Sequence, residues 1–141
     1  MPVRSTLTSH HWKSTPSAGK IDPDKYAGFV YTITHKETGR KYIGKKVYWS
    51  RRTEKIKGST RRRHKRTASD WKKYTGSCKP LNKEIAEQGK EAFEFKIVYQ
   101  GETRTAINYQ EAKRQFATDA IYSEDYYNDY IHTARFYGSR K

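Results

Sequence analysis

Two tyrosines, Tyr31 and Tyr42, stand eleven residues apart, and the second begins the run Tyr-Ile-Gly-Lys that ends at Lys45. A tyrosine hydroxyl has an ordinary pKa of about 10, so it needs a cationic neighbour before it can take part in proton transfer near neutrality. Lys45 could be that neighbour, and it could also contact an anion. Each tyrosine could equally be an ordinary strand residue, because aromatic side chains favour half-buried sheet positions.

The residues around the tyrosines predict the strands that would hold them. Phe29, Tyr31 and Ile33 alternate with Val30 and Thr32, which is the period-two pattern of a strand. A polar stretch at residues 35–40 follows, and its glycine can adopt the positive φ of a tight turn. Residues 41–45 then predict a returning strand. We expect a β-hairpin with one tyrosine in each strand.

The chain is strongly basic. Its 141 residues include 30 lysines and arginines against 15 acids, a formal net charge of +15, and residues 36–73 hold sixteen of these bases with only three of the acids. Such a charge attracts polyanions, so nucleic acid is the leading partner. A solvated basic tail would carry the same charge. This segment, however, begins inside the predicted hairpin and includes Trp49 and Trp71 near its two ends, which favours a folded DNA-binding face.

Composition leaves room for one domain with a small core rich in aromatic residues, since 33% of the residues are hydrophobic and 14% are aromatic. The single cysteine, Cys78, cannot form an internal disulfide, and no apolar run is long enough for a signal sequence or a membrane span. We therefore expect a cytoplasmic protein with no membrane partner and no small-molecule cofactor. The sequence leaves its oligomeric state open.

Residues 1–25 predict a polar N-terminal arm, and residues 26–141 predict the folded domain, with the basic segment at about 45–75. His10 and His11 lack further ligands at metal-binding spacing, so we expect no metal site there. The predicted elements beyond the hairpin are a helix from Val47 to Lys57 that Ser50 could cap, a helix from Leu81 to Gly89, a strand from Phe93 to Gln100, and a helix from Thr105 to about Tyr122. This order predicts a small α/β (α+β) domain, a three-stranded antiparallel sheet flanked by helices.

The tyrosine hairpin resembles the active-site hairpin of the GIY-YIG endonuclease family. Tyr42-Ile43-Gly44 matches the second triplet of the family name, whereas Phe29-Val30-Tyr31 keeps only the tyrosine of the first. The segments YIGKK, WKKYTGS, EQGKEAFEFKI, EAKRQF and YYNDYI, in this order, further resemble homing-endonuclease-like (Seg-type) proteins of bacteriophages. The resemblance implies the same small fold and the hydrolysis of phosphodiester bonds in DNA. It also implies action in the cytoplasm of a bacterial host.

The resemblance also implies the catalytic residues. Glu111, in QEAKRQF, matches the glutamate that holds one Mg²⁺, or Mn²⁺ in its place, to stabilise the phosphate and the leaving oxygen. One of Tyr31 and Tyr42 would activate or orient the attacking water while the other contributes hydrogen bonds, and Lys45 would act as a base or contact phosphate. By composition alone Glu111 would be an ordinary solvated helix residue. Glu102, Glu124 and Asp125 are the alternative metal ligands.

Two further family positions are harder to assign. The arginine expected about ten residues after the second tyrosine falls on Arg52, but the usual histidine or tyrosine four residues later is replaced by Ile56. The competitors for these two roles are Arg51, Arg62 and Arg63 for the arginine, and His64 and Tyr74 for its partner. Asn128 matches the family asparagine that braces the site, and it is equally readable as a turn residue.

The remaining bases predict contacts with the DNA backbone. The predicted DNA-binding residues are Lys46, Arg51, Arg61, Arg62, Arg63, Lys65, Arg66, Lys72 and Lys73. An alternative function is a non-catalytic basic DNA- or RNA-binding protein, structural or ribosomal-like. It would explain the charge and the aromatic residues. It gives no reason for the tyrosine spacing or for Glu111.

Overall fold

The computed structural model describes residues 10–55, 57–59, 62–131 and 136–137, and at residues 51–55, 62–66 and 136–137 it describes the backbone alone. Its centre is a mixed sheet of four strands in the order β1-β6-β2-β3. These strands are β1 (Lys13–Ser14), β2 (Gly28–His35), β3 (Lys41–Val47) and β6 (Phe93–Gly101). The tyrosine hairpin is confirmed as β2 and β3, which pair antiparallel.

The expectation of three strands is wrong, because β1 adds a short fourth strand parallel to β6. Only two residues make this strand, too few for any periodicity to show in the sequence. Trp12, immediately before β1, is 3% exposed and packs against Phe29 and Tyr31 of β2. The residues before the hairpin therefore supply part of the hydrophobic core.

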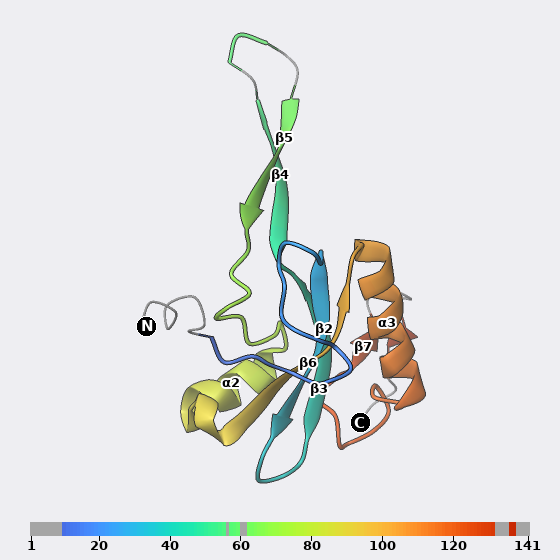
Figure 1. Ribbon diagram of the computed structural model, residues 1–141. Helices are drawn as coiled ribbons and strands as arrows, with labels where there is room; N and C mark the ends of the chain where they lie inside the picture. Colours follow the sequence, from blue (N-terminus) through green and yellow to red (C-terminus); the bar gives the residue numbers. More distant parts are fainter. Residues whose placement is uncertain (1–9, 56, 60–61, 132–135, 138–141) are drawn as a thin grey trace.

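Two α-helices in the described residues cover opposite faces of this sheet (Figure 1). Helix α2 (Lys79–Gln88) confirms the helix predicted from Leu81 to Gly89, and a short 3₁₀ helix, η1 (Lys90–Ala92), follows it. Helix α3 (Arg104–Ala117) confirms the last predicted helix but ends earlier, because Asp119 has a φ of 52° that cannot continue a right-handed helix. Two short strands, β7 (Tyr130–Ile131) and β8 (Phe136–Tyr137), pair near the C-terminus.

The helix predicted from Val47 to Lys57 is wrong. This segment contains β4 (Trp49–Lys55), which pairs antiparallel with β5 (Arg62–Ala68) in a separate two-stranded sheet. The two strands form a ribbon that extends away from the central sheet (Figure 1). A helix in this segment would have had few apolar residues to bury, whereas the two strands satisfy one another's backbone groups. The ribbon begins directly after β3, so it is attached at the end of that strand that carries Lys45.

The core has two layers, one on each face of the sheet. On the α2 face, Phe29, Tyr31 and Ile97 pack with Trp71 and Leu81. A smaller cluster forms against α3 on the opposite face and consists of Val30, Ile43, Ile107 and Ala120. Neighbouring residues of β2 and β3 thus serve different layers, as alternation along a strand requires. None of the helices in the described residues is long and apolar enough to cross a membrane.

Candidate active site

Tyr31 places its hydroxyl directly over the backbone of Gly44 in the neighbouring strand. The two residues are register partners, and a Cβ atom added at Gly44 would lie 2.4 Å from the Tyr31 hydroxyl oxygen. Tyr31 is 1% exposed, so its ring has no other place to go. The glycine of the Tyr-Ile-Gly triplet is therefore required by close approach, because any side chain there would displace the first tyrosine.

Three tyrosine rings meet on this face of β3. The ring centroids of Tyr42 and Tyr74 each lie 6.1 Å from that of Tyr31. The Tyr42 hydroxyl lies 3.4 Å from the hydroxyl oxygen of Ser77. Tyr74 and Ser77 come from the segment between β5 and α2, which thereby forms one wall of the site.

Burial makes Tyr31 and Tyr42 weaker acids than a solvent-exposed tyrosine. Desolvation, followed by the neighbouring tyrosines, raises the pKa of Tyr31 well above its ordinary value. Desolvation also raises the pKa of Tyr42 to about 12, although the hydrogen bond with Ser77 opposes the shift. Both phenols are protonated at neutral pH. In the free protein they can donate hydrogen bonds to an anion but cannot act as bases.

Glu111 and Lys45 meet on the opposite face of β3. Glu111 lies on α3 and is 5% exposed, and its Oε1 is 3.6 Å from the Lys45 ammonium nitrogen. Lys45 Nζ also donates to Asn108 Oδ1 at 2.6 Å. Burial raises the pKa of Glu111, and the nearby charge of Lys45 lowers it. Oε1 is buried and has no hydrogen-bond partner, so this carboxylate still has an unused acceptor.

The two groups form one site because β3 is the edge strand of the sheet. Tyr31 and Tyr42 belong to one core layer, and Lys45 contacts the helix of the other. The charge of Glu111 is the smallest of the causes that raise the pKa of both tyrosines, so the two groups lie within electrostatic reach of one another. A substrate at this edge can meet hydroxyls from one face and a lysine and carboxylate from the other.

Asn128 braces the same edge through the backbone of Ile43. Its Oδ1 accepts from the Ile43 amide at 2.9 Å, and its Nδ2 donates to the Ile43 carbonyl at 2.8 Å. Gln115 Nε2 donates to the same carbonyl at 3.1 Å. These amides cover the outward-facing groups of an edge strand, which would otherwise be unpaired. The geometry supports a positioning role for Asn128, acting on the strand two residues from Lys45.

Three contacts around the site were not predicted from the sequence. They are those of Asn108 with Lys45, of Gln115 with Ile43 and of Tyr74 with Tyr31. Asn108, Glu111 and Gln115 recur at intervals of three and four residues, the spacing of one helix face. That spacing was visible in the sequence. The hydrogen bonds from this face to Lys45 and Ile43 were not, because they depend on how α3 lies against the edge strand.

Lys46, predicted to bind DNA, is already engaged. Its ammonium nitrogen forms an ion pair of 2.7 Å with Asp70 and lies 4.0 Å from the ring centroid of Tyr74. Lys46 lowers the pKa of the Asp70 carboxyl, chiefly through their hydrogen bond. Lys46 thus holds the segment that contains Tyr74 against β3, which places the third tyrosine beside the first.

The arginine positions lie on the ribbon. The backbone places Arg52 opposite Lys65, Arg51 opposite Arg66 and Glu54 opposite Arg63, while Arg62 pairs with Lys55. Arg52 was expected on a helix and lies instead on strand β4, and its assignment as the family arginine stays a prediction. Arg61 lies outside the described residues, and the side chains of the other ribbon arginines are outside them too.

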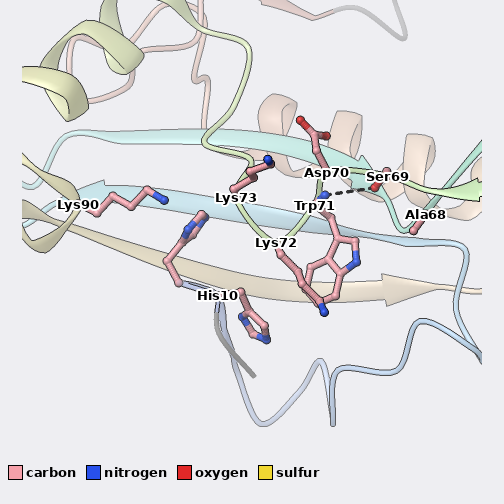
Figure 2. Close-up of a pocket in the computed structure, with 9 residues that line it drawn as sticks. His10, Ala68, Ser69, Asp70, Trp71, Lys72, Lys73 and Lys90 are labelled. Carbon is pink, nitrogen blue, oxygen red and sulfur yellow. Dashed lines mark hydrogen bonds between the residues drawn. The ribbon is translucent and has the colours of Figure 1, made fainter. Parts of the chain in front are cut away.

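Lys72 and Lys73 border a pocket of about 650 Å³ (Figure 2). His10, His11 and Lys90 also line this pocket. Burial lowers the pKa of His11 to about 4, and its Nε2 lies 2.8 Å from the Tyr74 carbonyl oxygen. Through these contacts the two histidines attach the N-terminal segment to the domain. Among the described residues, no cluster of three metal-ligating side chains is present.

Among the candidate metal ligands, only Glu111 is buried at the edge of β3. Glu102, Glu124 and Asp125 are exposed. A buried carboxylate beside a lysine, with protonated tyrosines around the strand edge, is suited to binding and cleaving an anionic ester. The fold and the site together define a small nuclease built around a tyrosine hairpin.

Comparison with protein families identifies which one. Residues 12–131 match the family model described as "Putative endonuclease segE, GIY-YIG domain". The match covers most of the chain, so the protein belongs to the GIY-YIG endonuclease family, in its Seg-type branch, and is a nuclease that hydrolyses phosphodiester bonds. Comparisons with curated proteins and with solved structures find no match.

Proposed function

We propose that the protein is a Mg²⁺-dependent DNA endonuclease whose metal ligand is Glu111. The observation that carries this proposal is a buried carboxylate whose Oε1 atom faces Lys45 at 3.6 Å but accepts no hydrogen bond from the described residues. Nothing in an ordinary helix explains why a glutamate should be taken out of water without a full set of hydrogen bonds. A divalent cation at this oxygen would explain it.

The donor set fits magnesium with a single protein ligand. Mg²⁺ prefers oxygen ligands and keeps several waters, so one carboxylate together with phosphate oxygens is sufficient. The bound ion would supply Lewis acidity to the phosphate and stabilise the departing oxygen. Mn²⁺ accepts the same ligand type. The nearby ammonium group of Lys45 shows that this carboxylate already faces a positive charge.

The side chains of the protein would perform the remaining tasks. Tyr31 and Tyr42, both protonated, donate hydrogen bonds to the attacking water or to the phosphate oxygens. Lys45 neutralises charge that develops on the phosphate, and Asn108 fixes the position of its ammonium group. Asn128 keeps β3 in place beside them. The two faces of the edge strand would thus act on one phosphodiester group.

DNA is the proposed substrate, and the protein would act in the cytoplasm of a bacterial host as a phage-encoded enzyme. A net charge of +15 supports strong, salt-dependent attraction to a polyanion. The ribbon concentrates this charge, because lysine or arginine stands opposite lysine or arginine at three of its cross-strand pairs. Like charges placed opposite one another repel. A polyanion lying against the ribbon would relieve that repulsion.

The nuclease proposal is tested by incubating supercoiled plasmid with the purified protein in Mg²⁺, in Mn²⁺ and in EDTA. Nicked or linear plasmid should form with either metal and not with EDTA. Cleavage that persists in EDTA would refute the metal requirement. Binding without cleavage in any metal would favour the non-catalytic alternative.

The proposed DNA-binding role of the basic segment is tested separately. Replacing Arg61, Arg62 and Arg63 with alanine should weaken binding to any duplex. The slope of log affinity against log salt should also fall, by up to about 0.9 for each phosphate that the protein no longer neutralises. A slope equal to that of the parent would show that this run does not touch DNA.

A further inference from the structure

The outer edge of β3 is closed along its first half. Lys41 donates to the Asp125 carbonyl at 2.9 Å and accepts from the Tyr127 amide at 2.7 Å. Ile43 is covered by Asn128. Outward-facing groups recur at every second residue of an edge strand, so Lys45 comes next. From Lys45 onward the neighbour of the edge changes from the C-terminal segment to the beginning of α3.

A groove of about 360 Å³ lies where this change occurs. It is lined by Lys45, Lys46, Val47, Arg104, Ile107 and Asn108. Three of the six residues are cationic and none is acidic. Grooves of this size accept small ligand groups, and the charge selects an anion.

Among the described residues, Arg104 is the cation in this groove without an acidic partner. Lys45 has Glu111 and Lys46 has Asp70. Arg104 is exposed and donates only one long hydrogen bond, from Nη2 to the Trp49 carbonyl at 3.4 Å. Within the part of the chain that the structure describes, it forms no ion pair. Its guanidinium retains most of its donors for a ligand, in a fork that matches phosphate oxygens.

Arg104 also shares a helix face with the catalytic carboxylate. Arg104, Asn108 and Glu111 follow one another at intervals of four and three residues, so they lie along one side of α3. Seven residues of α-helix span about 10 Å. Phosphates of one DNA strand repeat about every 3.4 Å along the duplex axis. A strand that follows this side of α3 would bring Arg104 to a phosphate a few steps from the one at Glu111.

We propose that the groove between the edge of β3 and the first turn of α3 is a phosphate-binding subsite. In it Arg104 contacts a backbone phosphate of the cleaved strand, one to three nucleotides from the scissile bond. This inference rests on the proposed nuclease function for its substrate. Arg104 is here a binding residue: it holds the strand in the groove and does not touch the reacting phosphate.

The test compares Arg104→Gln, Arg104→Lys and the matched control Arg114→Gln. Arg114 lies on the same helix, and its Nη1 donates to Gln110 within that helix at 2.7 Å. Both glutamine variants remove one positive charge from α3, so their difference isolates direct phosphate binding from the general field. Binding to a defined duplex is measured in EDTA over a range of salt concentrations, and single-turnover cleavage is measured in Mg²⁺ at saturating protein.

Arg104→Gln should weaken binding by about tenfold or more, the cost of removing a hydrogen bond to a charged group. It should also lower the salt slope by about 0.9 relative to Arg114→Gln. Arg104→Lys should keep the slope but recover only part of the affinity, since lysine lacks the fork. The saturated cleavage rate should stay within about threefold of the parent, as expected of an interaction that stabilises ground state and transition state equally.

The position of the phosphate is tested with duplexes that carry one neutral methylphosphonate at successive phosphates of the cleaved strand. The parent should lose affinity at one of the three phosphates beside the scissile bond, and Arg104→Gln should lose nothing further there. Equal sensitivity of both proteins at all three phosphates would overturn the subsite. So would a salt slope equal to that of Arg114→Gln, or a fall in the saturated rate with binding unchanged. If the parent never cleaves, the nuclease proposal fails, while the comparison in EDTA still decides whether Arg104 binds phosphate.

Discussion

Replacing Gly44 with alanine should displace Tyr31, because the structure leaves no space for the new methyl group. Its Cβ would lie 2.4 Å from the hydroxyl oxygen of Tyr31 and 2.5 Å from the ring carbon Cζ, where real Cβ contacts are at least 3.0 Å and ordinarily above 3.4 Å. Tyr31 must therefore move by about 0.6 to 1.0 Å. The ring centroid of Trp12, 4.9 Å away, limits that movement.

Overpacking of a full core costs about 1–3 kcal/mol of folding free energy. A displacement of about 1 Å in a catalytic group can lower the rate about a hundredfold. Gly44→Ala should therefore unfold at lower urea than the parent and cleave DNA far more slowly, even where it is fully folded. Urea denaturation and single-turnover cleavage measure the two effects separately.

Gly39→Ala is the matched control. Gly39 has a φ of 77° in the hairpin turn, and a Cβ there would meet nothing within 4 Å. This variant should lose about 1 kcal/mol or more to backbone strain but keep the parental rate while folded. If Gly44→Ala kept both the stability and the rate of the parent, Tyr31 would not lie over Gly44 as described.

Asn128→Ala should lower the free energy of unfolding by about 1–3 kcal/mol, because the buried amide and carbonyl of Ile43 lose its hydrogen bonds, and its exposed neighbour Asp129→Ala should behave like the parent in the same urea titration. Burial raises the pKa of Glu111, so the ionised carboxylate destabilises the fold. Glu111→Gln should therefore be more stable than the parent at about pH 8, and the difference should close as the pH falls towards about 4 and the parent takes up its proton. A difference that does not change with pH would show that the carboxylate is not desolvated. Tyr42→Phe should fold like the parent but cleave about tenfold to a thousandfold more slowly, and an unchanged rate would leave that hydroxyl without a catalytic role.

The parts of the fold that bury apolar residues were predictable. Alternation in β2 and β6 and the apolar spacing of α2 give strong periodic signals, and the structure has all three elements. The ribbon of β4 and β5 was not predictable in this way. Its strands are dominated by charged residues, so no apolar alternation distinguishes them from a helix or a loop. Strand β1 is too short to leave a pattern.

For the site, too, some features were predictable from the sequence and others were not. Tyr31, Tyr42 and Lys45 were predicted from the tyrosine hairpin, and Glu111 from the resemblance of QEAKRQF to the family motif. The structure places Lys45 beside Glu111 on the strand that carries Tyr42. Asn128 was predicted to brace the site, but its hydrogen bonds with Ile43, and that of Gln115 with the same residue, were not predicted. Which amide covers Ile43 depends on the packing of α3 and of the C-terminal segment against β3, and this is a tertiary property. The helix expected to carry Arg52 is replaced by strand β4, one of the two strands of the ribbon.

The central claim is that Glu111 holds the catalytic metal, and plasmid cleavage by Glu111→Gln tests it most directly. Glu102→Gln is the matched control, since Glu102 is an exposed glutamate close to the start of the same helix. With Mg²⁺ present, Glu111→Gln should bind DNA at least as well as the parent, because all phosphate-contacting cations remain, yet produce no nicked or linear plasmid. Glu102→Gln should cleave like the parent. Cleavage by Glu111→Gln at the parental rate would contradict the account and place the metal elsewhere.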